Sequence, residues 1–149
     1  MKISTRGRYG LRAMVDLAVY EHSGATPLRE IAERQNISEQ YLEQLFASLR
    51  KSGIVKSVRG AHGGYLLNHA PDEITVKDIL VALEGPIAPV DCVLSKDARK
   101  ECNSSDGCVT YDLWVRVKEN IDELLDSVKL SELKEEYKEK KITDFIYHI

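Results

Sequence analysis

The 149-residue chain has little of what marks several protein classes. It holds three cysteines and four prolines. An odd, small number of thiols argues against a disulfide framework. Few prolines, together with 43% apolar and 30% charged residues, argue against a disordered or collagen-like chain. We therefore expect one ordinary domain, or one compact domain with an oligomerising extension.

Long apolar runs are also missing. The longest runs have only a few residues, far short of the roughly 20 that cross a bilayer, so we predict no membrane span and no membrane partner. The N-terminus carries charge but neither an apolar stretch nor a small-residue cleavage site, which argues against a secretory signal. We expect a cytoplasmic protein.

Catalytic motifs are absent from the sequence as well. It contains no HExxH, no phosphate-binding glycine loop and no Ser/His/Asp set, and its paired carboxylates lie on helix faces where solvation explains them. We therefore do not expect an enzyme.

The charges that are present are distributed unevenly. Residues 1–69 carry ten Lys/Arg against six Asp/Glu, a net of +4, whereas residues 70–149 carry eleven against eighteen, a net of −7. A basic N-terminal half indicates that this half contacts a polyanion. Chance scatter of surface charge is the alternative.

Three helices are predicted in the basic half. Ser4 or Thr5 begins the first, which ends near residues 23–24. Thr26 and Pro27 open a short second helix as its N-cap and first residue, and Ser38 caps the third. Two short helices joined by a tight turn are typical of a helix-turn-helix, which presents its second helix to the major groove of DNA.

The third helix has two distinct faces. One is an apolar stripe that we expect to pack on the first two helices: Leu42, Leu45, Phe46 and Leu49. The opposite face carries groups that can contact base edges: Gln40, Gln44, Ala47 and Lys51, flanked by Glu43 and Ser48. An ordinary solvated helix face has a similar composition.

A β-hairpin wing is predicted after these helices. Strand-like runs at 53–58 and 65–67 flank a glycine-rich turn at 59–64. Arg59 and Gly60 stand at its tip, where the guanidinium can approach a minor groove or a phosphate. Arg6, Arg8 and Arg12, with Tyr9, crowd the start of the first helix, and we predict that this row contacts phosphates.

All three thiols lie in one polar segment. Thr75 caps a fourth helix that runs to about Glu84, and residues 86–110 then show no sustained periodicity. This segment contains Cys92, Cys102 and Cys108. A zinc site, a regulatory disulfide and an iron–sulfur cluster all fit three irregularly spaced cysteines, and the spacing leaves the three open.

Several motifs together resemble the IscR family of winged-helix, iron–sulfur cluster regulators. They are Lys2–Gly10, Tyr41–Phe46, Val58–Gly60 with Gly63–Tyr65, Leu83–Gly85, and the three cysteines before Leu113–Trp114. The resemblance implies a dimeric bacterial transcription factor that contacts DNA through the residues matching Glu43 and Arg59. It also implies a [2Fe-2S] cluster on Cys92, Cys102 and Cys108, supplied by cluster-assembly proteins.

The chain departs from that family at the cysteines. Nine residues separate Cys92 from Cys102, a longer gap than the family commonly has. Tyr111 stands where enterobacterial members have a histidine. The candidates for a fourth cluster ligand are therefore Tyr111, a carboxylate such as Asp106, and a group from a partner subunit.

The predicted DNA contacts are Arg6, Arg8, Tyr9, Ser38, Gln40, Tyr41, Glu43, Gln44, Lys51, Arg59 and Gly60. An apolar stripe along residues 112–128 is longer than a domain of this size needs internally, and we expect it to cross the same helix of a second copy. Packing on its own domain is the alternative. Beyond it we expect a polar helix from Ser131, with residues 135–141 solvated, and a tail that ends at Tyr147–Ile149.

The expected fold is mainly α with a small β-hairpin wing. It comprises a winged helix-turn-helix domain (1–84), a cysteine-bearing cluster loop (85–111), a dimerisation helix (112–130) and a C-terminal helix and tail (131–149). The expected function is repression of iron–sulfur cluster biogenesis genes, at a double-stranded operator bound by a homodimer. A nitric oxide or redox sensor that uses a cluster, zinc or thiols is the alternative.

Overall fold

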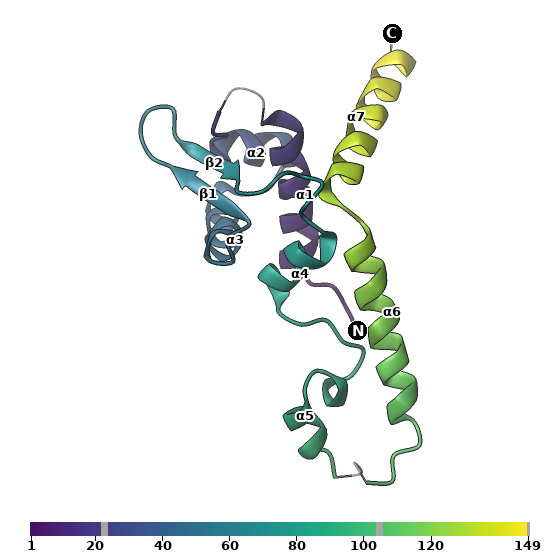
Figure 1. Cartoon of the computed structure of the whole chain (residues 1–149). Coiled ribbons are helices and arrows are strands. Elements are labelled where there is room, and N and C mark those ends of the chain that lie inside the picture. Colours follow the sequence, from purple (N-terminus) through teal and green to yellow (C-terminus); the bar gives the residue numbers. More distant parts are fainter. Residues whose placement is uncertain (22–23, 104–105, 149) are drawn as a thin grey trace.

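The computed structural model describes residues 1–21, 24–103 and 106–148. Helices α1 to α4 and a β-hairpin form one part of the molecule, which we call the head (Figure 1). Helix α6 extends away from the head as a long arm, with the cysteine segment beside its far end. Helix α7 follows α6 and lies alongside the head. The elements are α1 (Thr5–Tyr20), α2 (Leu28–Gln35), α3 (Glu39–Lys51), β1 (Val55–Val58), β2 (Gly64–Leu67), α4 (Val76–Glu84), the 3₁₀ helix η1 (Asp91–Val93), α5 (Lys96–Lys100), α6 (Tyr111–Ser127) and α7 (Leu130–Tyr147).

The predicted helix caps are confirmed at three positions. The Ser38 hydroxyl accepts from the N–H of Tyr41 at 3.0 Å. Thr75 and Asp78 form a reciprocal capping box at 3.0 Å in each direction. Ser4 is the N-cap of α1. Because each side-chain oxygen satisfies an N–H that the helix leaves free, the helix begins at the residue that follows.

Two helix boundaries differ from the prediction. α1 ends at Tyr20 and not near residues 23–24, and Ser23 lies outside the described residues. Pro27, not Thr26, is the N-cap of α2. The N–H and carbonyl of Thr26 instead pair with Tyr65 at 2.9 Å each, because the hairpin takes this residue as a β-bridge partner.

The core of the head joins the apolar faces of α1, α2 and α3. The predicted stripe of α3 is fully buried, together with Met14 and Leu17 of α1 and Ile31 of α2. Burying a side chain of this size contributes about 1.5–3 kcal/mol. The stripe therefore fixes which face of α3 remains for solvent.

A buried ion pair holds α2 against α1. Asp16 is fully buried, and Arg34 donates to its two carboxylate oxygens at 2.7–3.1 Å. The side-chain amide of Gln35 donates to the same carboxylate at 3.0 Å. Since the turn of the helix-turn-helix follows Gln35 directly, this network fixes where α3 starts.

The hairpin wing is confirmed. β1 and β2 are antiparallel, with Val55 opposite Leu67 and Val58 opposite Gly64. Gly60 adopts a φ of +113°, in the region that favours glycine, and so allows the turn after Arg59.

The C-terminal helix packs more closely than predicted. α7 begins at Leu130, one residue before the predicted start, and Leu130 is fully buried in the core of the head. Leu133 and Tyr137, one and two turns further, are half-buried. The expectation that residues 135–141 are solvated is therefore wrong at Tyr137. Residues 141–148 are exposed, and Ile149 lies outside the described residues.

Replacing Leu130 with alanine is expected to lower the free energy of unfolding by about 2–5 kcal/mol, because the change leaves a cavity in the core. Urea unfolding followed by circular dichroism measures this loss. Ile142, which is 61% exposed on the same helix, is the matched control. Its replacement by alanine is expected to change the free energy by less than about 0.5 kcal/mol, and equal losses in the two variants would contradict the packing of α7.

The apolar stripe of α6 is divided between two environments. Ile121, Leu125 and Val128 pack against a small cluster formed with α4, so the internal-packing alternative is correct for this part. Leu113 and Leu124 on the same stripe are 49% and 64% exposed. No residue of α6 is buried. No helix in the described ranges is both long and apolar enough to span a membrane.

Candidate DNA interface and cysteine segment

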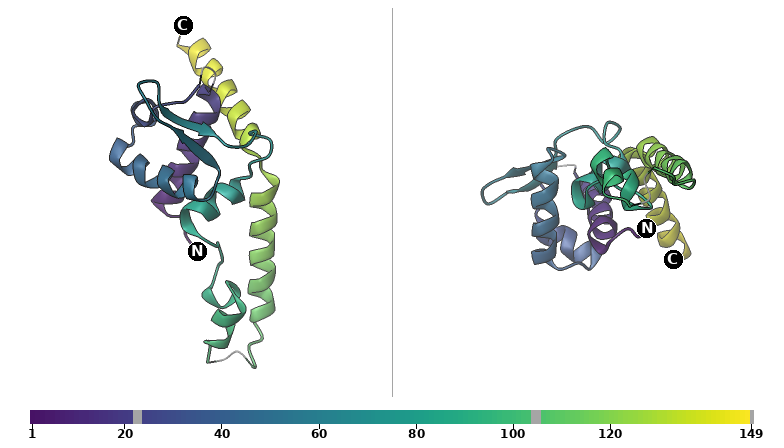
Figure 2. Two further views of the ribbon diagram at one scale, coloured as in Figure 1. Left: turned by 60° about the vertical axis from the view of Figure 1, so that its left-hand side comes forward. Right: turned by 90° about the horizontal axis from the view of Figure 1, so that it is seen from below.

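The predicted base-contacting face of α3 is exposed. Gln40, Glu43, Gln44 and Lys51 are all accessible on the side opposite the buried stripe. The hairpin lies on the same side of the head as α3, away from α6 and α7, in both Figure 1 and the right-hand view of Figure 2. Arg59 and Gly60 are exposed in its turn. These two elements therefore form one surface with amide, carboxylate and cationic groups.

Two predicted contact residues have structural roles at the start of α3. Ser38 is its cap. Tyr41 is half-buried, with its ring edge-on to Tyr9 at 6.3 Å between centroids and its hydroxyl 3.4 Å from Thr5 Oγ1. The first turns of α1 and α3 thus contact each other through aromatic side chains.

The predicted arginine row is split by the fold. Arg8 is exposed. Arg12 donates to the carbonyl of Gln35 at 2.8 Å. Arg6 is half-buried and donates to Leu83 and Ser48. Phosphate binding by this row stays a prediction.

The three cysteines lie along a segment with more structure than the sequence indicated. Cys92 is in η1, Cys102 follows α5 and Cys108 precedes α6, and all three thiols are free. η1 packs against both α5 and α6. The polar sequence hides these short helices, because α5 is only five residues long and starts with its own cap, Ser95.

The donor types suit an iron–sulfur centre, since thiolates are its usual ligands. In this structure, however, these donors are not grouped closely enough to form such a centre. Within residues 1–21, 24–103 and 106–148, no group of three His, Cys, Asp or Glu side chains lies close enough to hold a metal ion. A cluster on these cysteines therefore requires Cys92, Cys102 and Cys108 to come closer together.

The thiol of Cys108 has a distinct environment. Thr110 Oγ1 lies 3.3 Å from Cys108 Sγ, and hydrogen bonds from the Thr110 side chain and backbone lower the pKa of Cys108, with a smaller contribution from Arg99. Arg99 also stacks on the ring of Tyr111 at 4.0 Å. Tyr111, one candidate for the fourth ligand, is thus in contact with a cation. Sequence reasoning missed Thr110 and Arg99; a hydroxyl two residues after a cysteine was the one local clue.

Replacing Thr110 with valine is expected to slow alkylation of Cys108 by iodoacetamide at pH 7. The hydroxyl stabilises the thiolate, so its loss raises the pKa of Cys108 and lowers the ionised fraction at that pH. The difference is expected to disappear at about pH 10–11, where both thiols are ionised. Mass spectrometry of the Cys108 peptide gives the rates, and equal rates at pH 7 would exclude the role assigned to Thr110.

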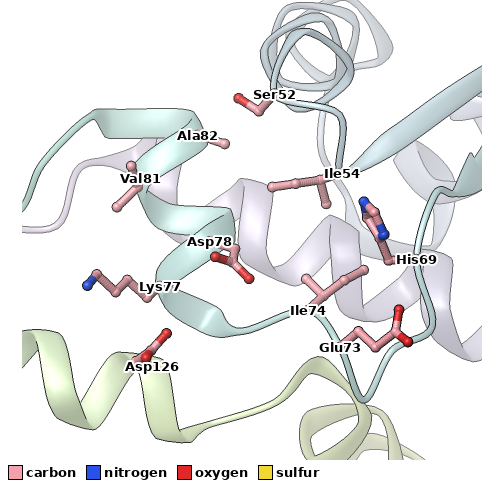
Figure 3. A pocket seen from close by; sticks show the side chains of 10 residues that line it. All are labelled: Ser52, Ile54, His69, Glu73, Ile74, Lys77, Asp78, Val81, Ala82 and Asp126. Carbon is pink, nitrogen blue, oxygen red and sulfur yellow. The ribbon is translucent and has the colours of Figure 1, made fainter.

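A hollow of about 570 Å³ lies between the base of the hairpin, α4 and the end of α6 (Figure 3). Its lining residues are Ser52, Ile54, His69, Glu73, Ile74, Lys77, Asp78, Val81, Ala82 and Asp126. None of the predicted DNA contacts or cysteines is among them. The candidate site therefore consists of an exposed surface and a cysteine segment, not of this hollow.

Comparison with known proteins agrees with this arrangement. Residues 3–136 match the Rrf2 family, described as an iron-dependent transcriptional regulator. The chain is 47% identical over 133 residues to the HTH-type transcriptional regulator CymR of Bacillus subtilis, covering 89% of each. It is 41% identical over 133 residues to the HTH-type transcriptional regulator IscR of Erwinia tasmaniensis, covering 89% of this chain and 78% of that protein.

A solved structure extends the likeness to the whole fold. "The Structure of CymR (YrzC) the Global Cysteine Regulator of B. subtilis" superposes with a TM-score of 0.75 at 46% identity, covering 91% of this chain and 97% of that one. The relatives named here are transcriptional regulators and not enzymes. Because the family match covers most of the chain and the head is a winged helix-turn-helix, the chain belongs to the Rrf2 family of transcriptional regulators.

Proposed function

We propose that this regulator binds a pseudo-palindromic DNA operator as a homodimer, and that the state of its three cysteines sets its affinity for that operator. In this proposal Cys92, Cys102 and Cys108 bind a [2Fe-2S] cluster, and the regulated genes, mainly repressed, are those of cluster biogenesis. The observation that carries the proposal is the placement of every thiol of the chain on one segment beside the start of α6.

The DNA-binding part of the proposal rests on α3 and the hairpin. Glutamine can pair with adenine and glutamate can accept from cytosine, so Gln40, Glu43 and Gln44 suit base contacts in a major groove. Arg59, exposed at the hairpin turn, suits a minor groove or a phosphate. Ser38, Tyr41, Lys51 and Gly60, together with Arg8 and Tyr9 of α1, complete the proposed set of DNA contacts. A helix-turn-helix dimer places its two α3 helices about 34 Å apart, one turn of DNA.

The dimer part rests on α6. A 17-residue amphipathic helix with no buried residue leaves Leu113 and Leu124 in water unless another surface covers them. A second copy offers the same stripe, and twofold symmetry makes such a contact self-complementary. Covering α6 in this way would bring the two cysteine segments into the same assembly.

The cysteine part rests on donor chemistry. When bound, a [2Fe-2S] cluster supplies two irons that take thiolate ligands and can change oxidation state. The chain's own contribution is three thiols, one of them with a lowered pKa, on a segment without buried residues in η1 or α5. Such a segment can rearrange without disrupting the core of the head. Cluster-assembly proteins would be the source of the cluster, and the cytoplasm the place where both meet DNA.

A second function has a specific observation in its favour. CymR, at 47% identity, is a relative described as a global cysteine regulator. Under this alternative the chain would respond to cysteine supply, and its three thiols would serve as redox groups, hold zinc or have no sensory role. Nitric oxide sensing through a cluster is a further variant of the first proposal.

Metal analysis of anaerobically purified protein separates these functions. The cluster proposal predicts brown protein with visible absorption and about two irons and two sulfides per chain. Zinc at about one per chain with no visible absorption would favour a zinc sensor. Colourless, metal-free protein that still binds DNA would favour the cysteine-regulator alternative.

A further inference from the structure

One side chain joins the start of the cysteine segment to α3. Arg6 Nε donates to the carbonyl oxygen of Leu83 at 3.3 Å, and Arg6 Nη2 donates to the hydroxyl of Ser48 at 3.1 Å. Leu83 lies in the last turn of α4, just before the cysteine segment begins at Gly85, and Ser48 lies on α3. We call these two hydrogen bonds the Arg6 bridge.

A second contact fixes the same end of α4. The backbone N–H and the hydroxyl of Ser4 both donate to the carboxylate of Glu84. Ser4 is also the N-cap of α1, so the Glu84 charge lies at the positive end of that helix dipole. The first turn of α1 and the last turn of α4 are therefore held together from two sides.

Two glycines within α1 show how close this approach is. Glycine inside a helix costs about 1 kcal/mol relative to alanine. A methyl group at Gly10 would lie 2.2 Å from a Leu83 methyl carbon, and one at Gly7 would lie 2.7 Å from Glu84 Oε1. A side chain at either position would require the Leu83 or Glu84 side chain to shift. The Arg6 bridge thus spans an interface for which the sequence of α1 is adapted.

Both ends of the Arg6 bridge lead to groups with a proposed function. On one side, Ile87 of the cysteine segment is buried in a cluster with Val76 and Leu80 of α4, and apolar residues of α6 pack against that cluster. On the other side, the Ser48 hydroxyl donates to the carbonyl of Gln44 at 3.5 Å. A shift of residues 84–88 would therefore change the position of Leu83 and reach the helix turn that carries Gln44. Figure 1 shows the start of α1 beside α4.

We propose that Arg6 is a positioning residue that couples the state of the cysteine segment to the placement of α3 on DNA. This inference deepens the proposed function and rests on it. A guanidinium suits the task because its rigid fork donates in two directions at once. An ammonium group is a single point charge and does not reproduce both bonds. Coupling of this kind changes the ratio of DNA affinities between two states of the protein.

Coupling and phosphate binding make different predictions for Arg6. Removal of a phosphate-binding group weakens DNA binding in every state and reduces the slope of log affinity against log salt by about 0.9. Removal of the Arg6 bridge leaves that slope unchanged and alters the ratio of affinities. Arg6→Lys separates the two roles because lysine keeps the charge, and Ser48→Ala removes the other end of the bridge without a change of charge.

The test compares the wild type with Arg6→Lys, Ser48→Ala and the control Arg29→Lys, an exposed position on α2 that is not among the predicted DNA contacts. Each full-length protein is reconstituted anaerobically with ferrous iron and sulfide, or stripped with a chelator. Its affinity for a duplex selected by the wild type from a random pool is then measured at several salt concentrations. We expect a ratio of affinities of at least about tenfold in the wild type and Arg29→Lys, and below about twofold in the two bridge variants.

Two results would overturn the inference. One is a wild-type ratio in both bridge variants, and the other is an equal loss of affinity in both states with a shallower salt slope for Ser48→Ala or Arg6→Lys. A ratio near one in the wild type instead contradicts the proposed function. A second measurement decides the bridge in that case: DNA is expected to slow amide hydrogen exchange at residues 83–90 of stripped wild type but not of Arg6→Lys, and equal slowing would exclude the bridge.

Discussion

Alanine at any one of Cys92, Cys102 and Cys108 is expected to abolish the visible absorption of anaerobically purified protein. A [2Fe-2S] cluster needs four ligands, and a chain that supplies three thiolates has no spare donor of the same kind. Iron content is expected to fall at least about tenfold, because loss of even an outer-shell partner of a metal ligand lowers metal affinity by about 10–100-fold. Absorption spectra and iron analysis of the three variants provide the measurement.

The same substitutions are expected to leave the head folded. None of the three cysteines is buried, and residues of this kind contribute little to the free energy of unfolding. Lys96→Ala, an exposed change in the same segment, is the matched control and should keep the wild-type spectrum. A variant that lacks one cysteine yet retains full colour and iron would remove that residue from the ligand set.

Arg59→Ala is expected to weaken DNA binding at least tenfold, because a positioned arginine contact to bases or phosphate is worth about 1–3 kcal/mol and each dimer contains two. Arg59 is exposed at the hairpin turn and has no role in the core, so the variant should fold normally. Titration of a labelled duplex, selected from a random pool, gives the affinity at matched salt. The salt slope should also fall by about one for each phosphate that the variant no longer neutralises.

Lys100→Ala is the control for this change of charge. Lys100 is exposed on α5, at the far end of the arm from the hairpin (Figure 1). We expect its replacement to change DNA affinity by less than twofold at physiological salt, where charges more than about 8 Å apart are largely screened. If Arg59→Ala and Lys100→Ala weakened binding equally, the effect would come from net charge and not from DNA binding by the wing.

The head was predictable because its local signals and its packing agree. Ser4, Ser38 and Thr75 cap the helices that they precede, and the stripe on α3 became the core that its spacing indicated. The glycine-rich turn predicted the wing. In each case a side chain interacts with residues close to it in sequence or on the same helix face.

The remaining features depend on contacts between distant residues. The sequence of α7 is polar with about one apolar residue per turn, and nothing local shows that Leu130 enters the core of the head. Thr26 is predicted to be the N-cap of α2, but its backbone pairs with Tyr65 of the hairpin. Arg6 is predicted to bind phosphate, and the sequence gives no sign of its partners in the structure, which lie 42 and 77 residues away. Arginine gives the same pattern in the sequence whether it binds DNA or another helix.

The most direct test of the account compares one preparation of the wild type in two states. Protein reconstituted anaerobically with iron and sulfide, and an aliquot stripped by a chelator, are titrated against the same labelled duplex by fluorescence anisotropy. The account predicts dissociation constants that differ at least tenfold between the aliquots, within the range of typical coupling energies. Equal dissociation constants for the brown and the colourless aliquot would contradict it.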